Sequence, residues 1–156
     1  MQIPLPAWIF QTIPEGIAMA ALVMSLGKRE LPWGIIFKIA ITYAITVYLV
    51  RIMPFTPGVH VIVLASALGI ISIIIGGLEM KRGLVYSAIA VALLVITEMV
   101  CIYLLVSLKV FTIEQLAGDL TARIIGGTPH TVLLFIYATI IKKKRISLEF
   151  LFRPRV

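Results

Sequence analysis

Apolar residues occupy long stretches of this 156-residue chain, and short polar clusters separate them. Each stretch is close to the roughly 20 residues that an α-helix needs to cross the hydrocarbon core of a bilayer. The pattern therefore predicts an all-α fold, an integral membrane bundle of five transmembrane helices. The predicted spans are residues 7–26, 33–53, 60–78, 84–108 and a fifth that starts between residues 123 and 128 and ends at residue 141.

Prolines and glycines set the expected ends of these spans. Pro32 stands where a first helical residue is expected, and Pro54 stops the second span. The start of the fifth span is harder to place, because the stretch "GGTPH" interrupts it. A helix beginning at Pro129 would be only about 20 Å long, which is too short for a bilayer core about 30 Å thick. We therefore expect a start near Arg123 and a bend over residues 126–129.

The connection between the fourth and fifth spans, residues 109–123, has a different pattern. Its stretch "TIEQ", from Thr112 to Gln115, fits a capping box at the start of a helix. Apolar residues then recur at helical spacing, at Ile113, Leu116, Leu120 and Ile124. This spacing predicts a short amphipathic helix on the outer membrane surface.

Composition supports a membrane location. Hydrophobic residues make up 61% of the chain and charged residues 13%, and the mean hydropathy is +1.11. Soluble domains are typically about 45–50% apolar and about 25% charged. The formal net charge of +7 does not indicate a nucleic-acid partner, because the basic residues cluster at the ends of the apolar runs, where contact with anionic lipid is expected.

The basic residues also predict the direction of the spans. Ten lysines and arginines lie in the first loop, the third loop and the C-terminal tail, whereas only Arg51, Lys109 and Arg123 flank the spans on the opposite side. The positive-inside rule then places the N-terminus outside the cell membrane and the C-terminus in the cytoplasm. We expect residues 1–145 to form the transmembrane domain and residues 146–156 a basic amphipathic cytoplasmic tail.

Each predicted span carries one ionisable group towards the same outer leaflet. These groups are Glu15, Arg51, His60, Glu98 and His130. A charge near the bilayer centre costs about 2.5–3.5 kcal/mol on insertion scales, so such groups usually face the bundle interior and pair with one another. The five residues are therefore candidates for a polar, ligand-binding pocket. Arg51, His60 and His130 also fit a simpler interpretation as interfacial residues that reach water.

Two local patterns add to this hypothesis. In the stretch "PEG", Pro14 removes a backbone donor and Gly16 weakens the helix beside Glu15, which is typical of an irregular helix lining a cavity. The third span carries small residues on one face, which lets another helix approach closely. These residues are Ala65, Gly69, Ser72 and Gly76, and their partner helix could belong to this chain or to a second copy.

Enzyme motifs are absent from the sequence. It has no Walker loop, no HExxH zinc site, no GxSxG elbow and no kinase motifs, and Cys101 is its only cysteine. The spacing of Glu15, Glu98, His60 and His130 does not predict a metal site. We therefore expect no enzymatic activity, no metal and no cofactor.

Three stretches carry a resemblance to a known class of membrane protein. They are "FQTIPEGIAM", "LPWGIIFKIAITYAITVYLVRIMPFTPGVH" and "GGTPHTVLLFIYATIIKKKR". They resemble the multi-pass N-terminal membrane sensor regions of histidine kinases from Gram-positive bacteria. The 156 residues contain no phosphoacceptor helix and no nucleotide-binding boxes. The resemblance therefore implies a sensor-like module that signals to a separate partner, and no kinase activity.

Two other functions stay open at this stage. Glu15 in the first span is similar to a glutamate in the first span of small proton-coupled multidrug exporters. On this interpretation, the chain would be a small proton- or ion-coupled transporter. A structural subunit of a membrane complex, or a homo-oligomer, would need only small-residue faces and a basic tail. A transporter requires a polar path to both sides, and the inner halves of the spans are almost wholly apolar. This favours a sensor-like or regulatory module.

Overall fold

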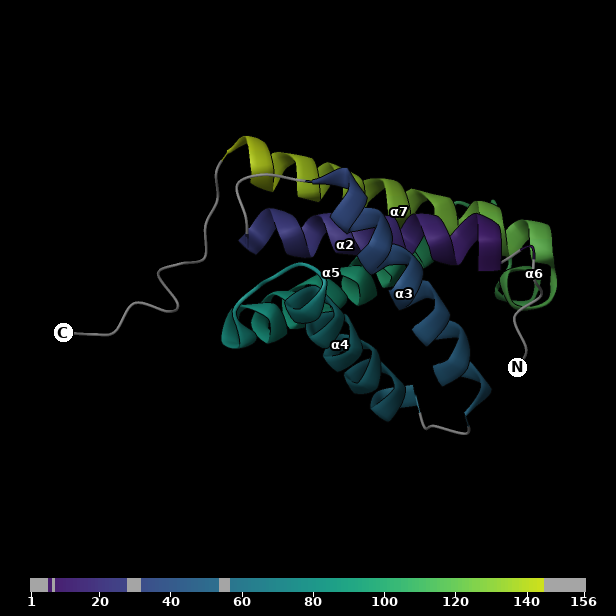
Figure 1. Ribbon diagram of the computed structural model, residues 1–156. Coiled ribbons are helices and arrows are strands. Elements are labelled where there is room, and N and C mark those ends of the chain that lie inside the picture. The colour runs from purple at the N-terminus through teal and green to yellow at the C-terminus, as the bar shows by residue number, and fades with distance from the viewer. Residues whose placement is uncertain (1–5, 7, 28–31, 54–56, 145–156) are drawn as a thin grey trace.

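The computed structural model describes residues 6, 8–27, 32–53 and 57–144, and every regular element in these ranges is helical (Figure 1). The all-α prediction is therefore confirmed for this part of the chain. A five-residue π-helix, η1 (Trp8–Thr12), leads directly into α2 (Ile13–Gly27). The later elements are α3 (Trp33–Ile52), α4 (Pro57–Ile74), α5 (Met80–Ser107), α6 (Ile113–Gly118) and α7 (Leu120–Lys143).

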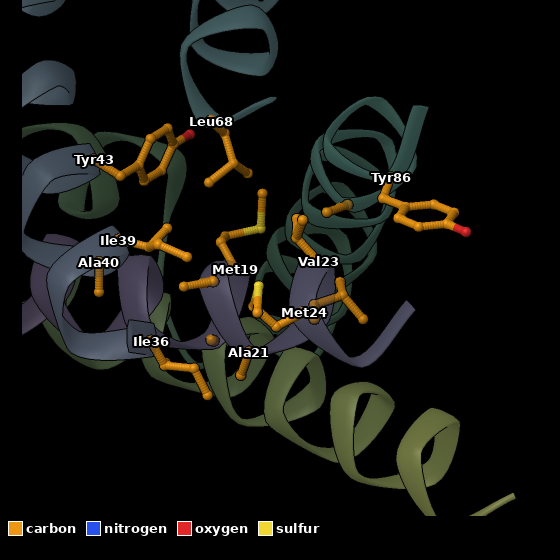
Figure 2. Close-up of a cluster of buried hydrophobic side chains, with 14 of the residues drawn as sticks. Met19, Ala21, Val23, Met24, Ile36, Ile39, Ala40, Tyr43, Leu68 and Tyr86 are labelled. Carbon is orange, nitrogen blue, oxygen red and sulfur yellow. The ribbon is translucent and has the colours of Figure 1, made fainter. Parts of the chain in front are cut away.

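Helix α2 forms the centre of the bundle and packs against α3, α5 and α7. Residues 18–24 of α2 are at most 3% exposed, as expected for a helix that is apolar on all sides. Small residues permit this close packing. A Cβ added at Gly16 would lie 3.1 Å from the carbonyl oxygen of Ala40 on α3. Figure 2 shows the side chains of α2, α3, α4 and α5 meeting in this core.

The outer faces of the helices remain apolar. On α3, Ile41, Ile45 and Leu49 are each about half exposed. Apolar patches of this kind are rare on soluble monomers and are expected where a helix faces lipid. Four helical stretches are long and apolar enough to cross a membrane, and they indicate a membrane protein. They are Trp8–Gly27, Trp33–Ile52, Met80–Ser107 and Leu120–Lys143.

Helix α4 is apolar but shorter than the other four. The sequence predicted a span over residues 60–78, whereas α4 runs from Pro57 to Ile74. The chain turns at Gly77, whose positive φ of 65° suits glycine and whose amide donates a hydrogen bond to the carbonyl of Ile73. The helix therefore ends earlier than predicted. Its 18 residues extend about 27 Å, slightly less than a bilayer core of about 30 Å.

The region after α5 also differs from the prediction. The capping box is confirmed, because Thr112 and Gln115 exchange hydrogen bonds between side chain and backbone. However, Leu120 and Ile124 of the predicted apolar pattern belong to the next helix, because α6 contains only six residues. Asp119 ends it and starts α7, since its carboxylate accepts a hydrogen bond from the amide of Thr121. Helix α7 then continues through residues 126–129, and Pro129 lies inside it.

The small residues of the predicted packing face lie within the bundle. A Cβ added at Gly69 would meet Ser87 Oγ at 2.8 Å and Leu84 Cδ2 at 3.0 Å, so this glycine faces α5. Ser72 is fully buried, and Ala65 packs against the core. Gly76 lies beyond the end of α4, close to Met24. These contacts use the small residues for packing within one chain.

Candidate functional site

A pocket of about 240 Å³ opens among the helices at one end of the bundle. All five ionisable residues singled out from the sequence, Glu15, Arg51, His60, Glu98 and His130, line this pocket. The structure therefore brings together side chains from five different helices. Three further polar side chains line the same pocket, namely Gln11, Tyr43 and Arg123.

The pocket forms at this end because successive helices alternate in direction. The starts of α2, α4 and α7 and the later parts of α3 and α5 contribute its polar residues. In Figure 1, α2 and α7 lie side by side along the bundle. Leu116 of α6 lies against Gly126 of α7 and adds an apolar wall. The remaining apolar lining consists of Val47, Val61, Leu64, Val91, Leu94, Val95 and Ile102.

The irregular start of the first long helix positions Gln11 and Glu15. Proline lacks an amide hydrogen and its ring clashes with the carbonyl four residues earlier, so a regular α-helix cannot continue unchanged before Pro14. The structure has a π-helical turn, η1, immediately before it. Such turns are frequent at functional sites. The irregularity therefore lies one turn before the stretch "PEG" in which the sequence predicted it.

Trp8 anchors this turn to α3. Its indole Nε1 donates a hydrogen bond to the carbonyl of Ala44, with a donor–acceptor distance of 3.0 Å. Its ring also packs edge-on against Tyr48. The turn is thus fixed to the helix that supplies Tyr43 and Arg51. The side chain of Gln11 packs against Gly127, where a Cβ would lie only 2.6 Å from the side-chain nitrogen Nε2 of Gln11.

Glu15 and His130 form the buried pair of the pocket. The carboxylate oxygen Oε2 of Glu15 lies 3.7 Å from Nε2 of His130, and the two side chains are 17% and 3% exposed. The distance is longer than a hydrogen bond. No hydrogen-bond partner for this buried Nε2 exists among the described residues. The pair is an ion pair only when the imidazole carries a proton, and its nitrogen is available to a further group.

Glu98 approaches the pocket from α5 and is half-buried. It interacts electrostatically with Glu15 and His130, and with the guanidinium groups of Arg51 and Arg123. Two carboxylates thus share one pocket with two permanently charged cations. This arrangement offsets the cost of placing either acid in an apolar bundle.

Arg51, His60 and Arg123 lie nearer the ends of their helices. Each is partly exposed, and Arg51 also interacts electrostatically with His60. Within the described part of the chain, no carboxylate lies within 4.0 Å of either arginine. The two guanidinium groups therefore keep donors that are not used in a direct ion pair.

Sequence reasoning did not select Tyr43 or Arg123. Tyr43, Val47 and Arg51 recur every four residues, so they share one face of α3, and this spacing was a usable signal. Arg123 was interpreted only as a residue flanking the fifth span. Because α7 begins at Leu120, Arg123 lies one turn inside the helix and reaches the pocket.

The pocket does not have the donor arrangement of a metal centre. In the described ranges, no group of three or more histidine, cysteine, aspartate or glutamate side chains is arranged to hold a metal ion. Cys101, on the same helix as Glu98, is buried and free. The carboxylates, imidazoles and guanidinium groups that line the pocket can recognise charged groups.

Comparison of the chain with protein families, curated proteins and solved structures finds no match. The class to which this fold and pocket belong is that of helical membrane proteins with a polar pocket at one end of the bundle.

Proposed function

We propose that this chain is a non-enzymatic, sensor-like or regulatory membrane module. In this proposal its pocket takes up a ligand from the outer side of the cell membrane, and a separate partner receives the signal. The observation that carries it is the pocket itself: ionisable side chains far apart in sequence line one cavity at one end of the bundle.

The opposite half of the bundle supports recognition over transport. Its core consists of side chains with 0% exposure, such as Leu22, Met24 and Ile36. In the described part of this half, the buried side chains with polar atoms include the uncharged Ser25, Ser72, Ser87 and Tyr86. A transporter needs a polar route to both sides, and a dense apolar core does not supply one.

The proposal includes five spans, with the N-terminus outside and the C-terminus in the cytoplasm. Successive helices run in alternating directions: α2, α3, α4, α5 and α7. This arrangement supports the proposal, because α4 then crosses the membrane between α3 and α5. A span of about 27 Å can cross where the bilayer thins locally. The distribution of basic residues then directs the pocket outwards.

The proposed partners lie at the inner face. Lys142, Lys143 and Lys144 are exposed at the end of α7, where they suit contact with anionic lipid headgroups. The predicted amphipathic tail, residues 146–156, lies outside the described residues. We propose that this tail contacts the inner membrane surface or a partner, which is either a second copy or another protein.

A host strain that lacks the chain provides the test. It is complemented with the wild type, with Glu98→Gln, or with Glu114→Gln, which alters an exposed glutamate of α6 outside the pocket. For a regulatory module, the transcript profile with Glu98→Gln should shift towards that of the deletion strain, at unchanged membrane abundance. The Glu114→Gln profile should match the wild type.

Two results would contradict the proposal. One is an unchanged transcript profile in the deletion strain and in both variants. The other is a proton flux in proteoliposomes of the purified chain that Glu98→Gln abolishes, because this would assign a transport function instead.

A further inference from the structure

The charges of the pocket are arranged in two layers along the helix axes. Glu98 lies nine residues before the end of α5, about 14 Å along its axis, and His130 lies ten residues after the start of α7, about 15 Å along that axis. Glu15 pairs with His130 and so belongs to the same deep layer. The deep layer therefore contains both carboxylates.

The permanent cations lie in the shallow layer. Arg51 is the penultimate residue of α3, and Arg123 is the fourth residue of α7, about 5 Å from the start of that helix. The two layers are about 10 Å apart along α7, and the flexible arginine side chains can shorten this distance. The pocket is thus acidic at depth and basic near its mouth, with equal numbers of carboxylates and guanidinium groups.

A ligand that complements this arrangement carries its charges in the reverse order. An organic cation fits at depth, where the carboxylates of Glu15 and Glu98 can accept hydrogen bonds from it, as can Nε2 of His130 when the imidazole is neutral. An anionic group fits at the mouth, where two guanidinium groups can hold it by charge-assisted hydrogen bonds. The acidic side chains are not arranged to hold a metal ion, which favours a wider organic cation.

We propose that the pocket binds a zwitterionic molecule, with an amino group at Glu15 and Glu98 and a carboxylate or phosphate at Arg51 and Arg123. This inference rests on the proposed function and names its ligand class. A ligand of zero net charge leaves the net charge of the pocket unchanged, and each of its charged ends offsets part of the charge of the layer that it contacts in an apolar bundle. The cavity of about 240 Å³ accommodates a small molecule of this kind.

Three probes with one carbon skeleton test the charge requirement. They are 6-aminohexanoate, hexylamine, which lacks the carboxylate, and hexanoate, which lacks the amino group. Binding is measured by titration calorimetry of the full chain in nanodiscs, with empty nanodiscs subtracted. The zwitterion should bind about tenfold or more tightly than either single-charge probe, because each lost charged contact reduces affinity by about that factor.

Variants assign each end of the probe. Arg123→Gln should weaken the binding of 6-aminohexanoate about tenfold and leave the binding of hexylamine unchanged. Glu98→Gln should weaken the binding of 6-aminohexanoate by the same factor and leave the binding of hexanoate unchanged. Lys109→Gln and Glu114→Gln are the matched controls outside the pocket, and both should bind like the wild type. A general loss of fold would weaken all three probes together, and the thermal unfolding of each variant checks this.

The zwitterion can come from water or from a lipid headgroup, and nanodisc composition distinguishes these sources. If phosphatidylethanolamine occupies the pocket, adding it to phosphatidylglycerol nanodiscs should weaken the binding of 6-aminohexanoate by competition. If the natural ligand comes from water, the added lipid should leave the binding of the probe unchanged. Equal affinity for a single-charge probe, or no binding of any probe, would overturn the zwitterion assignment. The regulatory proposal would fail separately, through an unchanged transcript profile in the deletion strain.

Discussion

Glu15 shows how a single residue in an apolar helix depends on residues far away in the sequence. A carboxylate in a bilayer needs a partner, a proton or water. The structure supplies His130 at 3.7 Å and places Glu98 and the two arginines around the same pocket. The acid is therefore tolerated because neighbouring helices share the electrostatic cost.

Gly127 provides a residue-scale prediction for the pocket. Gly127→Ala adds a Cβ that would lie 2.6 Å from the amide nitrogen of Gln11, so the flexible glutamine side chain must move. Alanine also favours the helix by about 0.5–1 kcal/mol over glycine, which should keep the unfolding temperature close to that of the wild type. We expect at least threefold weaker binding of 6-aminohexanoate in calorimetry.

Gly118→Ala is the control for this substitution, because nothing lies within 4 Å of a Cβ at that position. It should leave binding unchanged. If Gly127→Ala bound the probe as the wild type does, the contact between Gly127 and Gln11 would have no part in shaping the site.

Helix α4 depends on its close approach to α5. This approach is possible because Gly69 has no side chain and faces Leu84 and Ser87. The first half of the same helix contains His60 and Leu64, which line the pocket. Packing at one end of α4 therefore supports the position of residues at the other end.

At the scale of elements, we predict that Gly69→Val destabilises the bundle. Even a single added Cβ would lie 3.3 Å from the Cα of Leu84, and the backbone of α5 cannot move as a flexible side chain does. Overpacking of this kind costs about 1–3 kcal/mol. Thermal unfolding in detergent should show a lower midpoint than that of the wild type.

Gly58→Val is the matched control at the start of α4, where a Cβ would meet nothing within 4 Å. Its midpoint should stay close to that of the wild type. Equal midpoints for both variants would mean that α4 and α5 do not require this close contact.

At the scale of the whole molecule, the number of spans determines on which side each terminus lies. Four helices are long enough to cross, and α4 is the short fifth. If α4 crosses, the two termini lie on opposite sides of the membrane. If α4 only enters the outer half, the count is even and both termini lie on one side.

We predict opposite sides. Epitope tags at both ends should show the N-terminal tag accessible in intact cells and the C-terminal tag accessible only after permeabilisation. A tag inserted at Gly118, in the connection on the pocket side, should be accessible from outside and serves as an internal control. Two termini with the same accessibility would contradict the five-span topology.

A second whole-molecule prediction concerns the tail. Deleting residues 146–156 should leave membrane insertion and probe binding unchanged, because residues in the described part of the chain already form the core and line the pocket. The transcript profile should nevertheless shift towards that of the deletion strain, since the tail is proposed to contact the partner or the inner membrane surface. Loss of insertion would contradict this role.

The sequence by itself determined the helical class and the approximate positions of the helices. Hydrophobic length is a property of consecutive residues, so a run such as residues 33–53 indicates a long apolar helix without knowledge of its neighbours. It also selected Glu15 and Glu98, because the cost of a carboxylate in an apolar run is local. The capping box at Thr112 was predictable for the same reason: it involves residues three positions apart.

Only the tertiary structure decided which side chains meet. The rotation of α2 and α7 about their axes places Glu15 beside His130, and that rotation follows from close contacts such as Gly16 against Ala40 and Gly127 against Gln11. The same packing brings Tyr43 and Arg123 into the pocket, although neither looked unusual in its own segment. That the pocket binds a ligand stays a prediction. Its shape depends on how distant helices cross, and crossing is set by side chains that interlock across helix interfaces and not by the order of residues in one helix.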